Sequence, residues 1–418
     1  MNADSNRRYI RAHAGIGATL VSLFVLAAST TAIAQEKPSV VNVDCTQGET
    51  IFRALTRGNE SKPLLVLVRG TCNETVLIDR SDVTLRGEAG FGGGIAGPDP
   101  SVDTVTVTAS RVAIEDLTIT GGRNGISAVG AAGMNVRNAT VQSTGRNGVA
   151  FLSGASGAID GSTIGFNARD GVAVNAAAAT VRNSTIIQNA RMGVTVIQGG
   201  AAYIGTDTTL APAGNTISRN GGTGISVSNG ATATIAMNRI EGNGADPAST
   251  SGRSGVGITR ATADIAGGNV ISGNTGQGIS AVSSSVSIGN PAFSFSSVNT
   301  ITNNGDLASP GGGGIFAFVG SSVVIRDAVI SANKGFGLLY SVRSQGQLFS
   351  STIQDNAGDG IRLHLGSGLF LTLPATVVSG NAGLGLECTG GESSVVNTGL
   401  LSVSGNGLGG VSPGCTGF

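Results

Sequence analysis

Aliphatic residues recur in columns along most of the chain, and successive repeats are 22–25 residues apart wherever no insertion intervenes. Within each repeat they alternate with polar or small residues, which is the period-two pattern of β-strands. The clearest column follows a glycine that marks each repeat. The marker glycines are Gly125, Gly148, Gly171, Gly193, Gly224, Gly255, Gly278, Gly314, Gly337, Gly360, Gly385 and Gly410. The pattern predicts about twelve repeats, each with a few short strands separated by turns.

Two further aliphatic columns lie about ten and fifteen residues beyond the first, as Val149, Ile159 and Ile164 illustrate. A unit of about 22 residues leaves no room for a helix between strands, and it cannot bury its aliphatic face alone. Stacking the repeats about 4.8 Å apart pairs each strand with its equivalent in the next repeat. The sequence therefore predicts an all-β fold, a parallel β-helix.

Asparagine occupies the position four residues before most marker glycines. These residues are Asn167, Asn189, Asn220, Asn274, Asn333, Asn356, Asn381 and Asn406. The marker spacing is longer where insertions occur, at residues 204–217, 242–255, 288–301 and 304–314. Stacked asparagine amides can hydrogen bond to one another and to the backbone of tight turns. We therefore predict a structural asparagine ladder at one corner of the coil.

The N-terminal region differs from the repeats. A positively charged segment, an apolar stretch and a small-residue cleavage motif predict a signal peptide over residues 1–34. A single β-helix domain then covers residues 35–418. Ile51 and Ala54 have helical spacing, which predicts a short helix over residues 49–57 that caps the N-terminal end of the core.

Four cysteines lie in two pairs near the ends, Cys45 with Cys72 and Cys388 with Cys415. Four cysteines allow three pairings, of which this one is the simplest, and export permits disulfides. A zinc site is the alternative, but CxxC spacing and neighbouring histidines are absent. We expect a disulfide at each end of the domain.

With these motifs the chain resembles the right-handed parallel β-helix repeat proteins of the pectate-lyase-like superfamily. The resemblance covers about residues 40–416 and rests on the N-x-x-x-G-aliphatic unit, as in residues 167–172 and 356–361. It implies a right-handed coil. It implies no single activity, because the superfamily includes polysaccharide lyases, glycoside hydrolases, uronate epimerases and esterases, and fold does not fix function.

Composition narrows the function classes. Lys and Arg number 25 and Asp and Glu also number 25, so no basic excess favours a nucleic acid partner. After signal removal no apolar stretch is long enough to span a membrane. No dense group of Asp and Glu, or of His and Cys, suggests a metal. We expect no metal, no cofactor and a monomeric protein.

Catalytic signatures of the superfamily are missing from the sequence. His364 is interpreted as a surface residue of a strand. Asp170 and Asp359 have no acidic neighbour in their own column, which argues against the carboxylate pair that glycoside hydrolysis needs. Tyr203 and Lys334 remain candidate bases for a lyase or epimerase, although nothing in the sequence places them at one site.

Two charged columns carry more information. Glu115, Arg137, Asp160 and Arg182 alternate in sign on successive repeats, which predicts a structural salt-bridge ladder. The second column lies two residues before the marker glycine and holds only arginines. Its members are Arg123, Arg146, Arg169 and Arg191, with Arg253 two repeats later and with Asn124, Asn147 and Asp170 beside them.

Arginines stacked about 5 Å apart repel one another. A bound polyanion would remove this repulsion, because guanidinium groups pair with carboxylates or sulfates through two hydrogen bonds. The alternative is a solvated turn in which the arginines fan apart or pair with nearby acids. We favour an exported scaffold, secreted or periplasmic, that binds acidic polysaccharide or a surface partner without catalysis. The alternative function is a lyase or epimerase of uronic-acid polysaccharide.

Overall fold

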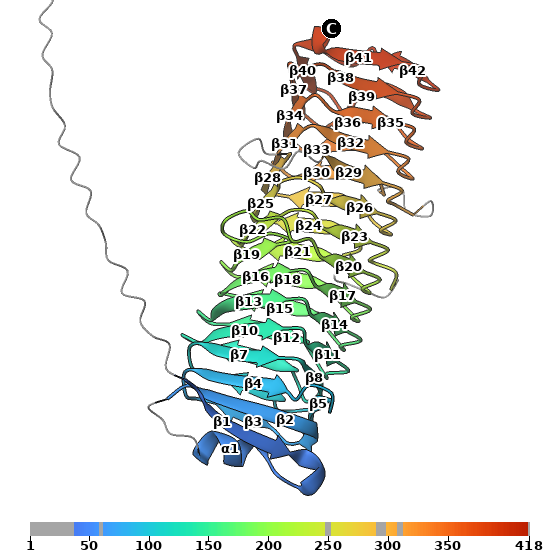
Figure 1. Cartoon of the computed structure of the whole chain (residues 1–418). Coiled ribbons are helices and arrows are strands. Elements are labelled where there is room, and N and C mark those ends of the chain that lie inside the picture. The colour runs from blue at the N-terminus through green and yellow to red at the C-terminus, as the bar shows by residue number, and fades with distance from the viewer. Residues whose placement is uncertain (1–36, 58–61, 247–251, 290–297, 307–311, 417–418) are drawn as a thin grey trace, which may run out of the picture. The chain divides into compact units, whose positions relative to one another are not determined.

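Three parallel sheets, here called A, B and C, wind through the computed structural model, and most coils contribute one strand to each (Figure 1). The structure describes residues 37–57, 62–246, 252–289, 298–306 and 312–416. The predicted signal peptide lies outside the described residues. Sheets A and B share strand β2 and together hold 28 strands, whereas sheet C has 14.

Each strand spans three to ten residues. Sheet A contains β1 (Ser39–Asp44), β2 (Leu64–Asn73), β4 (Val83–Gly87), β7 (Val112–Glu115), β10 (Gly133–Arg137), β13 (Ser156–Asp160), β16 (Ala178–Arg182), β19 (Ala201–Ile204), β22 (Thr232–Ile235), β25 (Thr262–Ile265), β28 (Ser285–Ile288), β31 (Ser322–Arg326), β34 (Gln345–Phe349), β37 (Gly368–Thr372) and β40 (Ser394–Val396). Sheet B contains the end of β2, then β5 (Gly93–Gly97), β8 (Leu117–Gly121), β11 (Thr140–Gln142), β14 (Thr163–Gly165), β17 (Thr185–Ile187), β20 (Thr216–Ser218), β23 (Arg239–Glu241), β26 (Val270–Ser272), β29 (Asn299–Thr302), β32 (Ala328–Ser331), β35 (Thr352–Gln354), β38 (Thr376–Ser379) and β41 (Leu401–Ser404). Sheet C contains β3 (Val76–Ile78), β6 (Val105–Val107), β9 (Ile126–Val129), β12 (Val149–Leu152), β15 (Val172–Asn175), β18 (Val194–Ile197), β21 (Ile225–Ser228), β24 (Val256–Thr259), β27 (Ile279–Val282), β30 (Ile315–Phe318), β33 (Leu338–Ser341), β36 (Ile361–His364), β39 (Leu384–Thr389) and β42 (Gly409–Val411).

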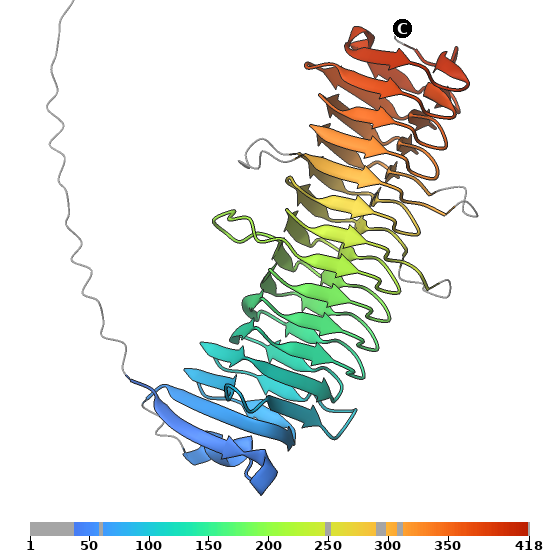
Figure 2. The ribbon, with the colours of Figure 1, turned by 45° about the vertical axis from the view of Figure 1, so that its right-hand side comes forward.

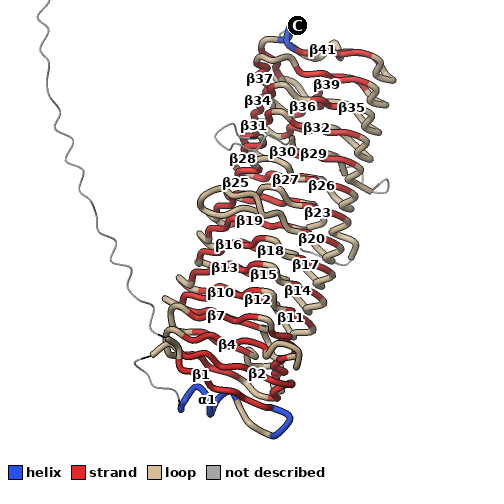
Figure 3. The backbone as a smooth tube through the Cα atoms, in the orientation of Figure 1, coloured by secondary structure: helices blue, strands red, loops and turns tan. Residues whose placement is uncertain are grey.

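The predicted aliphatic columns lie in register inside the coils. Val149 pairs with Val172, and Val172 pairs with Val194, in neighbouring strands of sheet C. All three side chains are fully buried, as are Ile159 and Val181 of sheet A. In Figure 3 the strands form columns that turns separate, as the alternating pattern predicts. Like side chains thus stack on like, and one continuous core fills the inside of the stack.

The number of coils is larger than the marker glycines predict. Twelve strands of sheet C follow or contain a marker glycine, but the sheet has 14, because β3 and β6 precede the first of these glycines. At the equivalent position before β6 stands Thr104, whose hydroxyl donates to the carbonyl of Gly121 at 2.9 Å. The first coils therefore build the same corner without the glycine, and a count of glycines misses them.

The predicted helix is present at the N-terminal end as α1 (Ile51–Arg57). Ile51 and Ala54 are buried against the first coil. The carboxylate of Glu74 accepts hydrogen bonds from the backbone N–H of Ile51 at 2.7 Å and of Phe52 at 3.1 Å. This side chain satisfies two of the free N–H groups at the start of the helix and fixes α1 over the open end of the core.

Both predicted disulfides are present, Cys45–Cys72 and Cys388–Cys415. The first joins a short 3-10 helix, η1 (Cys45–Gln47), to strand β2. The second joins β39 to the segment after β42, beyond a second 3-10 helix, η2 (Thr398–Leu400). Figure 2 shows the ribbon passing coil by coil between these two cross-linked ends.

Polar ladders run along the corners of the coil. At the corner between sheets B and C the side chain of Asn167 donates to Asn189 Oδ1 at 2.8 Å, and the side chain of Asn189 donates to Asn220 Oδ1 at 2.9 Å. The ladder also includes Asn243 and Asn304. Sequence spacing missed these two, because insertions separate them from their marker glycines.

The sequence did not reveal two other ladders. A second asparagine ladder lies at the corner between sheets A and B, and it consists of Asn215, Asn238, Asn269 and Asn299. At the corner between sheets C and A, serine hydroxyls accept hydrogen bonds from backbone N–H groups of the preceding coil. These serines are Ser284, Ser321, Ser344 and Ser367. Ladders on all three corners keep the backbone of the tight turns hydrogen bonded inside the stack.

Candidate functional site

Four arginines lie one above another at the corner between sheets B and C. We call Arg123, Arg146, Arg169 and Arg191 the arginine edge. The backbone N–H of Arg169 donates to the carbonyl of Arg146 at 2.8 Å, and that of Arg191 donates to Arg169 at 2.8 Å. Because these hydrogen bonds hold successive turns in register, the side chains leave the backbone at intervals of one coil.

Two buried aspartates neutralise the ends of the arginine edge. Arg123 Nε lies 2.8 Å from Asp103 Oδ1, and Arg191 Nε lies 3.0 Å from Asp170 Oδ1. Only 6% of the Asp103 side chain and 4% of the Asp170 side chain are exposed. The carboxylates therefore lie below the surface, while the guanidinium groups that they contact remain partly exposed.

Hydrogen bonds keep Asp103 ionised in spite of its burial. Burial acts to raise the pKa of this carboxyl, but donors from Arg123, Ser127 and Asn124 outweigh it and hold the pKa below its ordinary value. Ser127 Oγ donates to Oδ2 at 2.7 Å, and Asn124 Nδ2 donates to Oδ1 at 2.9 Å. Arg123 and Asn124 donate from the turn before β9, and Ser127 donates from β9 itself.

The two central arginines have no carboxylate of their own. Among the described residues, neither Arg146 nor Arg169 makes a salt bridge. Burial lowers the pKa of the Arg169 guanidinium, and the neighbouring charge of Arg191 lowers it further. The carboxylate of Asp170 acts in the opposite direction, and Arg146 adds a smaller lowering effect. Positive charge is thus concentrated at the middle of the edge without full compensation.

The other residues predicted for this site lie differently. Asn124 and Asn147 are buried, and their side-chain oxygens accept from the backbone N–H groups of Asn147 and Asp170 in the next coil, at 3.2 and 3.4 Å. Arg253 lies beyond a coil that has Gly222 at this position, and its Nε donates to the carbonyl of Gly244 at 2.9 Å. The surface-exposed group is therefore the arginine edge itself.

The alternating charged column on sheet A forms the predicted ladder in part. The register pairs Arg137 with Glu115 and Asp160, and Asp160 with Arg182. Ion pairs join Glu115 to Arg137 at 3.1 Å and Asp160 to Arg182 at 3.0 Å. Arg86 pairs with Glu115 at one end, and Asp207 pairs with Arg182 at the other, which extends the ladder beyond the predicted residues.

A second charged cluster lies on sheet C near the C-terminal end. Arg362 Nη2 is 2.6 Å from Asp359 Oδ2, and Arg362 also pairs with Glu387. The guanidinium carbon of Arg362 lies 4.4 Å from the centre of the Phe336 ring, and the backbone N–H of Leu384 donates to Asp359 Oδ1 at 2.7 Å. Two carboxylates therefore share one cation within a half-buried group.

This carboxylate pair is not visible in the columns of equivalent positions. The equivalent of Asp359 in the next coil is Leu384, whereas its acidic neighbour is Glu387. The available signal was the register of Arg362 and Glu387, which pair directly in β36 and β39. A long side chain on the next strand can reach across to a turn residue, so the two members of such a pair stand in different columns.

Glu387 should make stability depend on pH. Burial raises its pKa from the ordinary value of 4.5, and the Asp359 carboxyl raises it further, against the effect of Arg362. The folded protein thus binds this proton more tightly than the unfolded chain does, so the contribution of Glu387 is full below pH 4.5 and is lost as pH rises through the raised pKa. We expect Glu387→Gln to raise the Tm at neutral pH, and the difference from wild type should vanish at acidic pH.

Thermal melts from acidic to neutral pH check this expectation. The control is Glu392→Gln, because Glu392 is exposed and makes no ion pair with the described residues. The control should follow the wild-type pH profile. A Glu387→Gln variant that is less stable than wild type at neutral pH would show that the ion pair with Arg362 outweighs burial.

His364 and the two candidate bases, Tyr203 and Lys334, do not converge on one site. His364 is half-buried in β36, and its Nδ1 lies 2.9 Å from Thr389 Oγ1. Tyr203 lies on sheet A, whereas Lys334 lies at the corner between sheets B and C, five coils beyond Arg191. Within the described part of the chain, no group of three His, Cys, Asp or Glu side chains could hold a metal ion. None of the helices described is long and apolar enough to cross a membrane.

Solved structures similar to this chain include three enzymes whose names contain a polysaccharide. The periplasmic alginate epimerase AlgG is 13% identical over 90% of this chain and 84% of its own, with a TM-score of 0.47. The pectate lyase Pel9A is 13% identical over 85% and 78%, with a TM-score of 0.42. The A-module of the mannuronan C-5 epimerase AlgE4 from Azotobacter vinelandii is 15% identical over 88% and 93%, with a TM-score of 0.39. These likenesses bear on neither activity nor substrate.

A family model gives a firmer result than these likenesses. No curated protein sequence matches the chain. The model described as a right handed beta helix region matches residues 68–209 and 268–400, which is more than half of the chain. These residues include most of the coils and a large part of the asparagine ladder between sheets B and C, from Asn167 to Asn189 and from Asn274 to Asn381. The chain therefore belongs to the family of right-handed β-helix proteins.

Proposed function

We propose that the protein is an exported, monomeric β-helix scaffold that binds an acidic polysaccharide along the arginine edge without cleaving it. The observation that carries the proposal is the pair Arg146 and Arg169. These cations are stacked on successive coils and make no salt bridge among the described residues. The disulfides at both ends are consistent with an oxidising compartment outside the cytoplasm.

Repulsion between the stacked arginines would favour an anionic ligand. Two unit charges about 5 Å apart repel by roughly 1 kcal/mol in water, and salt screens exposed charges further. A chain that carries an anion on every unit relieves this repulsion at several arginines at once. Guanidinium groups suit carboxylates or sulfates because they donate two parallel hydrogen bonds. Linked contacts of this kind add up to an avidity that a single anion does not reach.

Removing the central cations should weaken this binding. We expect the double variant Arg146→Ala plus Arg169→Ala to bind polygalacturonate, alginate or heparin at least about tenfold more weakly, because a hydrogen bond to a charged group contributes roughly 1.5–3 kcal/mol. Its Tm should not fall, since neither side chain pairs with a carboxylate. Titrations at low and physiological salt measure both the affinity and its salt dependence.

A matched control separates the site from net charge. The pair Arg53→Ala and Arg57→Ala removes the same charge from the exposed face of α1, where neither side chain makes an ion pair with the described residues. This control should retain wild-type affinity. Equal losses of affinity in both double variants would show that net charge alone explains the effect. Unchanged affinity in the arginine-edge variant would refute the proposal.

A second candidate function is a lyase or epimerase of uronic-acid polysaccharide. The observation that favours it is the convergence of Asp359, Arg362 and Glu387 on one surface. In this arrangement the charged groups are paired with one another, which leaves no free base for proton abstraction, so binding remains the first choice. Ultraviolet detection of unsaturated products from polygalacturonate or alginate tests the lyase. Product that disappears in Glu387→Gln would establish the enzyme.

A further inference from the structure

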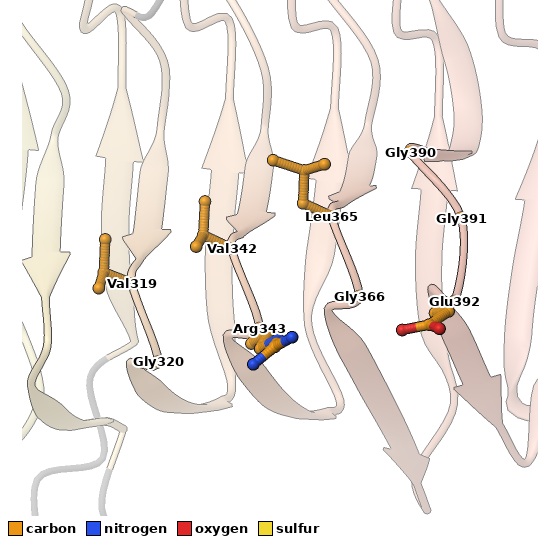
Figure 4. Close-up of a pocket in the computed structure, with 9 residues that line it drawn as sticks. All are labelled: Val319, Gly320, Val342, Arg343, Leu365, Gly366, Gly390, Gly391 and Glu392. Carbon is orange, nitrogen blue, oxygen red and sulfur yellow. The ribbon is translucent and has the colours of Figure 1, made fainter.

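A groove lies at the corner between sheets C and A, on the opposite edge of sheet C from the arginine edge (Figure 4). Turns from four successive coils line it, and its volume is about 790 Å³. Pockets for small molecules have volumes of roughly 300–1,000 Å³ and combine apolar walls with a few placed polar groups. The groove is therefore large enough for one or two units of a small ligand.

Three aliphatic side chains form the floor of the groove. Val319, Val342 and Leu365 occupy the same turn position in successive coils, with φ of 51°, 53° and 51°. They are exposed or half-buried, and the exposed fraction reaches 42% at Val319 and 45% at Leu365. Figure 4 shows the three side chains standing side by side on their turns.

This position strongly disfavours aliphatic residues. Every coil from β12 onward to the groove needs a left-handed backbone here, and the earlier coils use polar or small residues. These are Ser153, Ala176, Gln198, Asn229, Arg260 and Ser283. A β-branched side chain with positive φ is a rare and costly conformation. Costly backbone conformations concentrate at functional sites, and here the apolar side chains gain little burial in return. A contact partner outside the chain would account for them.

Two opposite charges stand across the groove without pairing. A Cβ atom placed on Gly366 would lie 3.7 Å from Arg343 Cγ and 4.0 Å from Glu392 Oε2, so the two side chains flank this glycine. Figure 4 shows them on either side of it. In the described residues neither Arg343 nor Glu392 has an ion-pair partner. A ligand between them must accept hydrogen bonds from the guanidinium and donate hydrogen bonds to the carboxylate.

These constraints select the chemistry of the ligand. An anionic ligand would gain from Arg343 but would be repelled by Glu392. A wholly apolar ligand would cover both charged groups without satisfying them, which is costly. A hydroxyl group both donates and accepts. A ring that has an apolar C–H face and hydroxyl groups on its rim satisfies the floor and both charges.

We propose that this groove binds a neutral sugar ring, as one unit of an oligosaccharide, with its C–H face on Val342 and Leu365 and its hydroxyl groups between Arg343 and Glu392. The site is separate from the arginine edge and does not depend on it. The molecule would then hold a charged chain at one edge of sheet C and a neutral sugar at the other.

Binding of defined neutral sugars tests the groove. The probes are neutral hexasaccharides of glucose, mannose and galactose, and the free monosaccharides are tested separately. Calorimetric titration and saturation-transfer NMR measure their binding to the mature protein. At least one hexasaccharide should bind more tightly than its monosaccharide. Leu365→Asn should weaken it about tenfold or more, the effect of losing an apolar contact in a pocket. No binding by any neutral probe at millimolar concentration would overturn the proposal.

The variants separate binding from folding. Asparagine readily adopts the left-handed conformation, so Leu365→Asn should keep the wild-type Tm. Gln198→Asn is the matched control at the same turn position outside the groove, and it should bind sugar as wild type does. Glu392→Gln keeps the shape of the groove and should also lose affinity, which supplies a second test should Leu365→Asn fail to fold.

Two outcomes would place the sugar elsewhere and so overturn the proposal. The first is wild-type affinity in both Leu365→Asn and Glu392→Gln. The second is loss of neutral-sugar binding in Arg146→Ala plus Arg169→Ala, since these arginines lie on the other edge of sheet C. That double variant should retain full affinity for the neutral probe even as it loses affinity for polyanions. Failure of the groove and failure of the arginine edge are thus distinguishable.

Discussion

Asn243→Ala should lower the free energy of unfolding by about 3 kcal/mol or more, because its fully buried side chain takes part in four hydrogen bonds. Asn243 Nδ2 donates to Asn274 Oδ1 and to the carbonyl of Ile217, each at 3.0 Å. Asn243 Oδ1 accepts from the backbone N–H of Asn220 at 3.1 Å and from its side chain at 2.9 Å. Alanine leaves the Ile217 carbonyl and the Asn220 N–H without these partners. Buried polar groups that lose their partners cost roughly 1–3 kcal/mol each.

Chemical denaturation followed by far-ultraviolet circular dichroism measures this loss. Asn175→Ala is the control, because Asn175 is half-buried at the outer face of β15 and makes no side-chain hydrogen bond with the described residues. The control should remain within about 0.5 kcal/mol of wild type, as is usual for surface substitutions. Equal stability of the two variants would show that the ladder contributes no more than a solvated amide does.

Gly224→Ala should be the second most damaging change, with an expected loss of about 3 kcal/mol from overpacking. The marker glycine lies under the asparagine ladder, in a place with no space for a side chain. A Cβ atom on Gly224 would lie 2.7 Å from the carbonyl oxygen of Gly255, 2.8 Å from Asn243 Nδ2 and 2.8 Å from Ile240 Cγ2. All three atoms belong to the next coil, so the methyl group would push neighbouring coils apart.

A glycine one coil further on provides the matched control for this substitution. Gly257 lies in β24, and a Cβ atom there would meet only Thr223, at 3.4 Å or more. Gly257→Ala should be neutral or slightly stabilising, because alanine loses less backbone entropy than glycine. Urea midpoints of the two variants give the comparison. Similar losses at both positions would mean that strand propensity, rather than contact with the ladder, explains the marker glycines.

Most of the fold could be predicted from the sequence, because a solenoid repeats the same environment in every coil. Columns such as Val149, Val172 and Val194 appear at fixed spacing, and stacking then determines their pairing. The prediction failed where spacing along the chain and position in space diverge. Asn243 and Asn304 belong to the ladder although insertions shift them away from their marker glycines, and the first coils lack a marker glycine.

The candidate sites were harder to predict, because they depend on contacts between unlike positions. The sequence placed the arginines in one column, but it could not show that Asp103 and Asp170 form their salt bridges with the two end arginines, Arg123 and Arg191. The Asp359–Glu387 pair joins a turn to a neighbouring strand. The groove depends on three turn residues with positive φ, and backbone angles are not visible in a hydrophobic pattern.

The two disulfides bear on how the stack would come apart. Each coil contacts only its neighbours, so an inner coil is held on two sides and a terminal coil on one. Unfolding therefore begins by fraying of a terminal coil and advances inward one coil at a time. Each disulfide spans 27 residues, about the length of one coil, and each lies at one of the two ends. The covalent links thus stand where fraying would start, and the inner coils, which carry the arginine edge and most of the groove, melt only after a linked end has opened.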